Sequence, residues 1–160
     1  MEENQMTAKH SHDLKITVES GGVLPAETCD GPDYTPQIEI EGLWAPYLAI
    51  VVDDPTSTGG FTHWLIWNIP GMIRIPRNLP KAMDISFPIP ALQGMNSFGK
   101  IGYTGPCPPE GTVHTYSVRV YGLDGPVDAR PGTGRESLEK SLSGHIVQYG
   151  QADVKYGRRD

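Results

Sequence analysis

The chain has 160 residues, of which 38% are hydrophobic and 20% are charged, and its formal net charge is -6 at pH 7. This length predicts a single domain with one core, and the acidic balance argues against nucleic acid as a partner. No apolar run reaches the roughly 20 residues that cross a bilayer. The first residues also lack the apolar core of a secretory signal. We therefore expect a cytoplasmic protein without a transmembrane segment.

The first half of the chain has the pattern of β-strands. Residues 1–12 are polar and predict a flexible lead-in, which leaves 13–160 as the domain. In the segment 13–19 Leu14, Ile16 and Val18 alternate with polar residues, and segment 38–40 repeats this half-buried pattern. The runs 47–52 and 63–69 are apolar on both faces. They predict two central strands, joined by a loop over 53–62.

The second half predicts a long loop, a strand, a helix and a last strand. The stretch 71–109 is rich in Pro, Met and Gly, and strand character returns at 113–123. Thr133 and Glu136 form a capping box that predicts a helix ending at Gly150. The face of this helix that packs on the sheet would consist of Leu138, Leu142, His145, Ile146 and Tyr149. Segment 152–157 predicts a short strand, so the fold is mainly β with one amphipathic helix.

Three ionisable residues lie at the ends of these strands, on faces that are otherwise apolar. His63 shares its face with Leu65 and Trp67, His114 begins its strand on the face of Tyr116, and Asp54 ends its strand before Pro55. If these strand ends meet, two imidazoles and a carboxylate form a site for a phosphate-like anion. Backbone N–H groups of Gly59, Gly60 or Gly105 would complete it. Structural histidines and a zinc site with two His and one Asp are the alternatives.

Two cysteines, Cys29 and Cys107, lie far apart in the sequence and do not have the spacing of a zinc or redox motif. We interpret both as reduced thiols. No metal and no cofactor is expected.

Two segments resemble a known family. The strings "DDPTSTGGFTHWLIWNIP" and "GKIGYTGPCPPEGTVHTYSVRVYGLD" closely resemble the two signature blocks of the phosphatidylethanolamine-binding proteins, which include the Raf kinase inhibitor proteins. The ending "LSGHIVQYGQADVKYGRR" is similar to that of the bacterial and archaeal branch. The resemblance implies a Greek-key arrangement of two antiparallel sheets with a C-terminal helix.

The resemblance also implies a set of ligand-binding residues. The positions that match the family's anion pocket are Asp54, His63, His114, Gly105, Pro106, Phe61 and Tyr116, with Tyr156 near its C-terminal side. This chain departs from the family motif D-P-D-x-P, because Thr56 replaces its second Asp and Thr58 its second Pro. The loop thereby loses one negative charge and one conformational constraint.

The expected function is non-catalytic binding of a phosphate-bearing ligand, such as a phospholipid headgroup, a nucleotide or a phosphorylated residue, with regulation of a partner. One alternative is inhibition of a kinase or protease through a surface loop such as 76–90. Another is a hydrolase that uses His63 or His114 as a base, with Ser57, Thr62 or Cys107 as nucleophile, although the motif G-x-S-x-G is missing. Prokaryotic relatives are often dimeric, so a homodimer is a further expectation.

Overall fold

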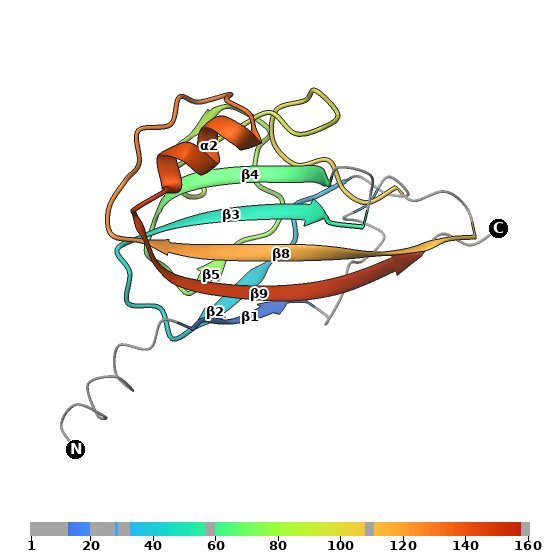
Figure 1. Cartoon of the computed structure of the whole chain (residues 1–160), viewed down its shortest axis with the longest axis horizontal. Helices are drawn as coiled ribbons and strands as arrows, with labels where there is room; N and C mark the ends of the chain where they lie inside the picture. The colour runs from blue at the N-terminus through green and yellow to red at the C-terminus, as the bar shows by residue number, and fades with distance from the viewer. Residues whose placement is uncertain (1–12, 20–27, 29–32, 57–59, 108–110, 158–160) are drawn as a thin grey trace, which may run out of the picture.

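The computed structural model describes residues 13–19, 28, 33–56, 60–107 and 111–157, and most of its regular structure there is β (Figure 1). A six-stranded sheet has the order β6-β7-β4-β3-β8-β9, and a three-stranded sheet has the order β1-β2-β5. All paired strands are antiparallel. The elements are β1 Lys15–Val18, β2 Ile38–Glu41, β3 Tyr47–Asp54, β4 Phe61–Pro70, β5 Arg74–Ile75, β6 Asp84–Ile85, β7 Ala91–Gln93, β8 Val113–Leu123, α2 Arg135–Leu142 and β9 Ile146–Gly157. The prediction of two antiparallel sheets and a C-terminal helix is confirmed.

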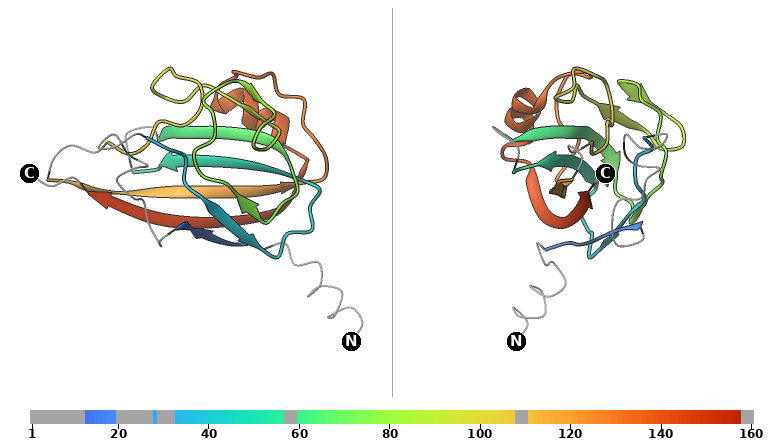
Figure 2. Two further views of the ribbon diagram at one scale, coloured as in Figure 1. Left: turned by 180° about the vertical axis from the view of Figure 1, so that it is seen from behind. Right: turned by 90° about the vertical axis from the view of Figure 1, so that its right-hand side faces the viewer.

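The large sheet lies between the small sheet and helix α2 (Figure 2). Alternate residues of β3 point to opposite faces, so Leu48 and Ile50 pack toward the small sheet, while Ala49 and Val51 pack toward α2. The central strands are therefore buried on both faces, as their continuous apolar runs predicted.

A β-bulge changes the face on which His63 lies. Val52 pairs with Trp64 and Asp53 pairs with Thr62, so His63 is an extra residue in β4. The bulge turns its ring toward Tyr116, on the face of the small sheet, whereas Leu65 packs on the α2 side. The prediction that His63 shares the face of Leu65 and Trp67 is therefore wrong, because strict alternation does not hold across a bulge.

Helix α2 is shorter than predicted. It ends at Leu142, and Gly144 follows with a φ of 84°, a left-handed conformation that stops a helix. Ile146 and Tyr149 belong instead to the long strand β9, which includes the predicted strand 152–157. His145 bonds to Asp124 through Nδ1 at 2.9 Å rather than packing on the sheet. The N-cap is Gly134 without a side-chain hydrogen bond, so the predicted capping box is not formed.

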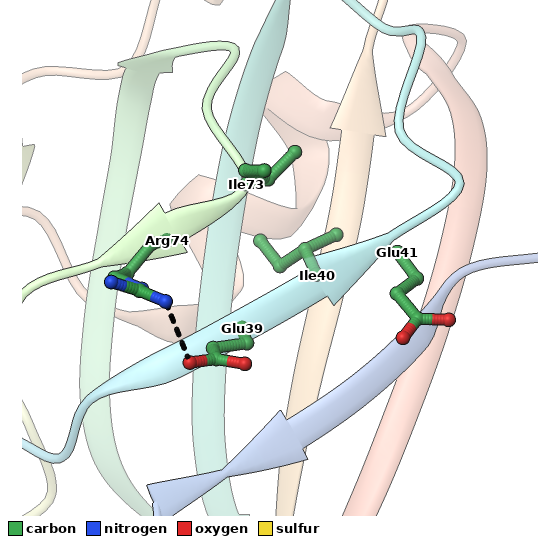
Figure 3. A pocket seen from close by; sticks show the side chains of 5 residues that line it. All are labelled: Glu39, Ile40, Glu41, Ile73 and Arg74. Carbon is green, nitrogen blue, oxygen red and sulfur yellow. Dashed lines mark ion pairs between the residues drawn. The ribbon is translucent and has the colours of Figure 1, made fainter.

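The long stretch 71–109 contains the short strands β5, β6 and β7. Along β2 and β5 of the small sheet a cavity of about 340 Å³ is lined by Glu39, Ile40, Glu41, Ile73 and Arg74 (Figure 3). Arg74 Nη2 lies 3.3 Å from Glu39 Oε2, and both side chains are largely exposed. An exposed, isolated ion pair such as this one contributes little to the free energy of unfolding.

The cysteine prediction needs a correction. Cys107 is disulfide-bonded, so its interpretation as a reduced thiol is wrong. Cys29, the other cysteine of the sequence, lies outside the described residues. The lead-in 1–12 also lies outside them. Spacing along the chain says little about a pair of distant cysteines, because pairing depends on how the fold places them. Among the described residues, none of the helices has the length and apolarity needed to cross a membrane.

Candidate functional site

Asp54 is the last residue of β3, and its side chain is buried where the strand ends. Its Oδ1 accepts hydrogen bonds from the backbone N–H and the hydroxyl of Thr56, at 2.9 and 2.6 Å. Its Oδ2 lies 2.6 Å from Nδ1 of His114. These contacts fix the orientation of the carboxylate. Thr56 therefore donates to Asp54 from the position where the resembled family has a second acid.

His114 lies near the start of β8, and its side chain is 27% exposed. Because the carboxylate of Asp54 accepts hydrogen bonds, Nδ1 of His114 is assigned as the protonated nitrogen. This tautomer leaves Nε2 as the ring nitrogen that can meet a ligand. The ring stacks on Tyr116 with centroids 6.2 Å apart.

His63 is almost fully buried, with 3% of its surface exposed. Its Nδ1 lies 2.7 Å from the carbonyl oxygen of Thr104, which only accepts, so this imidazole also presents Nε2. Burial lowers the pKa of His63 below its ordinary value of 6.5. The bond to Thr104 and the negative charges of Asp54, Asp33 and Asp53 oppose part of this shift. The ring of His63 is therefore neutral at pH 7.

Aromatic rings surround the two imidazoles. The centroid of His63 lies 5.3 Å from those of Phe61 and Tyr116 and 5.7 Å from that of Phe98. Burial and the charge of Asp54 raise the pKa of Tyr116, which keeps its hydroxyl protonated. The rings of Phe61 and Phe98 pack edge to face, with their centroids 4.7 Å apart. The site thus combines polar groups with an apolar wall.

The loop around Gly105 differs from its expected role. The N–H of Gly105 donates to Oδ1 of Asp33 at 2.8 Å, so it is already engaged and is not aimed at a ligand. Oδ2 of Asp33 forms an ion pair with Lys81 at 3.4 Å. Pro106 is buried next to Gly105. Of the other glycines proposed as donors, Gly60 is exposed, and Gly59 lies outside the described residues.

Tyr156 lies beside His114. The two residues are a cross-strand pair of β8 and β9, so their side chains share a face. The Tyr156 ring is partly buried against the core between the sheets, and its hydroxyl accepts a bond from Thr28 at 3.2 Å. The structure therefore brings Asp54, His63, His114, Phe61, Tyr116 and Tyr156 to one end of the large sheet.

The sequence analysis missed four residues that shape the site. Asp33 anchors Gly105, Thr104 orients His63, and Phe98 extends the aromatic wall. Asn96 is buried, and its Oδ1 accepts a hydrogen bond from the backbone N–H of Phe98 at 2.9 Å. Its Nδ2 also donates to the carbonyl of Gly102 at 2.9 Å. These residues lie in loops, where no periodic pattern reveals which side chain points inward.

The zinc alternative has no support in the part of the chain that the structure describes, since no group of three or more His, Cys, Asp and Glu side chains there could hold a metal ion. The Asp54 carboxylate contacts Nδ1 of His114, whereas Nδ1 of His63 contacts the carbonyl oxygen of Thr104.

Two solved structures share this fold. That of a putative phosphatidylethanolamine-binding protein homolog, CT736, from Chlamydia trachomatis has a TM-score of 0.79 at 24% identity, and the match covers 92% of this chain and 99% of that chain. The structure of Escherichia coli YbcL, described as a new member of the mammalian family, has a TM-score of 0.78 at 22% identity and covers 90% and 98%. At these identities the likeness shows the fold alone.

The sequence comparisons identify the family. A UPF0098 protein of Pyrococcus horikoshii is 47% identical over 141 residues, which are 85% of this chain and 71% of that protein. A UPF0098 protein of Pyrococcus abyssi is 48% identical over 141 residues, which are 85% and 79%. The family model for phosphatidylethanolamine-binding protein matches residues 15–157. The chain therefore belongs to the phosphatidylethanolamine-binding protein family.

Proposed function

We propose that this protein binds phosphate-bearing ligands without chemical change, at the site of Asp54, His63 and His114, and thereby regulates a partner. The observation that carries the proposal is the shared arrangement of the two imidazoles. Each uses Nδ1 for a fixed acceptor and lies against Tyr116, which leaves Nε2 for a ligand. Phospholipid headgroups, nucleotides and phosphorylated residues all present phosphate oxygens, to which His63 donates when its ring is protonated and from which it accepts when the phosphate carries a proton.

The protonation of His63 decides which anions bind well. A neutral Nε2 accepts a hydrogen bond, so it pairs with the P–O–H group of a singly protonated phosphate. A fully ionised anion requires the ring to take up a proton first, and burial opposes this uptake. The phosphate dianion HPO₄²⁻ keeps one P–O–H group, whereas the sulfate dianion has none. The site should therefore distinguish the two ions when His63 is neutral.

We expect phosphate to bind about tenfold more tightly than sulfate near pH 7.5, because phosphate makes one hydrogen bond to Nε2 of His63 that sulfate leaves unmade. As the pH falls through the lowered pKa of His63, the ring becomes a donor to either ion, so sulfate affinity rises and the gap closes. Calorimetric or NMR titrations of both ions between about pH 5 and pH 8 measure this. The double variant His63→Ala, His114→Ala should lose binding, while His145→Ala, at the far end of β9, should retain it. Undiminished binding in the double variant would refute the proposed site.

Non-catalytic binding is supported by the placement of the candidate nucleophiles. The hydroxyl of Thr62 accepts a bond from Arg135, on the opposite face of the sheet from His63. Cys107 is disulfide-bonded. Ser57 lies outside the described residues. Of the candidate nucleophiles that the structure describes, neither Thr62 nor Cys107 is placed to serve a hydrolase mechanism based on His63 or His114.

A second candidate function, inhibition of a kinase or protease through the loop 76–90, is favoured by one observation. Phe87 in this loop is 80% exposed and Met83 is 49% exposed, so the loop presents two large apolar side chains that a partner could cover. If this candidate is correct, Phe87→Ser should abolish inhibition in assays of the purified protein against serine proteases and kinases. The same variant should bind inorganic phosphate like the wild type. Inhibition that persists in Phe87→Ser would exclude this loop residue as the contact.

A further inference from the structure

The residues next to Asp54 and His63 form a pair on the other face of the large sheet. Asp53 precedes Asp54, Thr62 precedes His63, and Asp53 and Thr62 are cross-strand partners of β3 and β4. Both point toward α2, while Asp54 and His63 face the candidate site. Any group that holds Asp53 and Thr62 together therefore also sets the spacing of Asp54 and His63.

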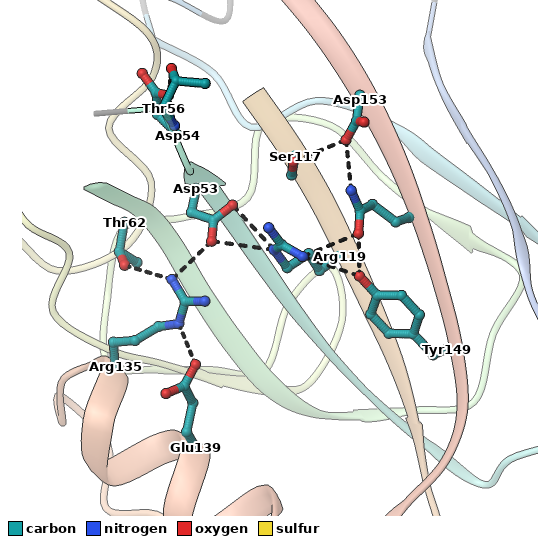
Figure 4. Close-up of polar contacts among 11 residues, drawn as sticks. Asp53, Asp54, Thr56, Thr62, Ser117, Arg119, Arg135, Glu139, Tyr149 and Asp153 are labelled. Atoms are coloured by element: carbon teal, nitrogen blue, oxygen red, sulfur yellow. Dashed lines mark hydrogen bonds and ion pairs between the residues drawn. The ribbon is translucent and has the colours of Figure 1, made fainter. Parts of the chain in front are cut away.

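Arg135, the first residue of α2, contacts both members of this pair (Figure 4). Its Nη1 lies 3.0 Å from Oδ2 of Asp53 and 3.0 Å from Oγ1 of Thr62. Its Nε donates to Oε2 of Glu139 at 2.8 Å, one turn further along the helix. The planar guanidinium is thus held by three partners through Nη1 and Nε, an arrangement that the single ammonium of a lysine does not reproduce.

A second arginine holds Asp53 from the other side. Arg119 on β8 donates from Nε to both carboxylate oxygens of Asp53 at 3.2 Å, and from Nη1 to Gln151 at 3.1 Å. Arg119 therefore links Asp53 to β8 and β9. Arg135 differs from Arg119 in that it also contacts Thr62. It therefore connects Asp53 of β3 to Thr62 of β4.

The bulge makes this link important. Between Val52 and Asp53 the pairing of β3 and β4 shifts register, and His63 is the extra residue. A bulge interrupts the ladder of backbone hydrogen bonds, so the spacing of the strands is less strictly set at this point. We propose that Arg135 is a positioning residue that fixes the placement of His63 relative to Asp54 from the opposite face of the sheet. This inference rests on the proposed function.

The test compares variants that separate position from charge. Arg135→Lys keeps the positive charge but cannot form the three fixed contacts, whereas Arg135→Gln removes the charge as well. We expect both variants to bind inorganic phosphate about tenfold more weakly than the wild type, as for other supporting contacts around a binding site. Thr62→Val, which removes one contact and preserves shape and charge, should weaken binding in the same direction by about threefold. Arg74→Gln, on the exposed ion pair of the small sheet, is the matched control and should bind normally.

A second readout makes a failure of this inference distinguishable from a failure of the proposed function. The titration curves of the His63 and His114 imidazoles are recorded by NMR without phosphate, in proteins whose amide spectra show that they are folded. We expect these curves to move in Arg135→Lys and Thr62→Val and to stay unchanged in Arg74→Gln. Wild-type titration curves and wild-type phosphate affinity in Arg135→Lys would overturn the inference, because charge alone would then explain any effect of Arg135→Gln.

Discussion

Replacing Asp54 by Asn is expected to reverse the tautomer of His114. In the wild type Oδ1 of Asp54 accepts two bonds from Thr56, and Oδ2 accepts the Nδ1–H of His114. The two donors of Thr56 would keep the amide oxygen of Asn at the Oδ1 position, so the amide NH₂ would face His114. A donor cannot face a donor, and His114 must then accept at Nδ1 and carry its proton on Nε2. The side of the ring that meets the ligand changes from an acceptor to a donor.

This change alters anion binding in a defined direction. The Nε2–H of His114 would then donate to a dianion, and the nearby carboxylate charge is removed. We expect Asp54→Asn to bind sulfate about tenfold more tightly than the wild type near pH 7.5. Asp54 also raises the pKa of His63, so its loss lowers that pKa further and weakens the rise in affinity at acidic pH.

The ¹⁵N chemical shifts of the His114 ring nitrogens report the tautomer directly, and a sulfate titration reports the affinity. Asp153→Asn is the control, because Asp153 bonds to Ser117 at 2.9 Å on the opposite face from His114. It should leave the tautomer and the affinity unchanged. An Nδ1–H tautomer in Asp54→Asn, or weaker sulfate binding in that variant, would contradict the assigned hydrogen bonding.

The strands of the core could be predicted from the sequence because burial on both faces leaves a continuous apolar run. β3 and β4 are read correctly for this reason. The sequence predicts too long a helix, because Ile146 and Tyr149 continue the helical spacing of Leu138 and Leu142 although they belong to a strand. Gly144 decides between them through its positive φ, which a helix does not continue. Local backbone conformation, not hydrophobic pattern, sets that boundary.

The site could be predicted in part. Asp54 lies at the end of β3 and His114 near the start of β8, and these two strands pair with each other, so alternation predicts the correct face for both residues. His63 was placed on the wrong face, since one extra residue in a strand reverses the alternation beyond it. Asp33 could not be found, because its bond to Gly105 joins two loops far apart in the sequence. Such contacts depend on tertiary structure alone.

Replacing Asp53 by Ala is expected to cause a large loss of stability. Asp53 is 4% exposed and accepts from the guanidinium groups of Arg119 and Arg135. Its removal leaves two partly buried cations facing each other without the carboxylate that they share. Breaking a buried ion pair on one side costs about 3–5 kcal/mol. Because both arginines keep some exposure to water, we expect the free energy of unfolding to fall by about 3 kcal/mol, measured by urea denaturation.

Two comparisons decide whether the loss of the buried ion pairs of Asp53 causes the fall in the free energy of unfolding. Glu39→Ala breaks the exposed ion pair with Arg74 and should change the free energy of unfolding by less than about 1 kcal/mol. The double variant Asp53→Ala, Arg135→Met removes one of the two cations along with the carboxylate that they share, so it should be more stable than Asp53→Ala alone. A loss in Asp53→Ala no larger than that in Glu39→Ala would show that the arginines find water or other partners as readily as they find Asp53. The carboxylate would then have no special part in holding β3, β4 and α2 together behind the site.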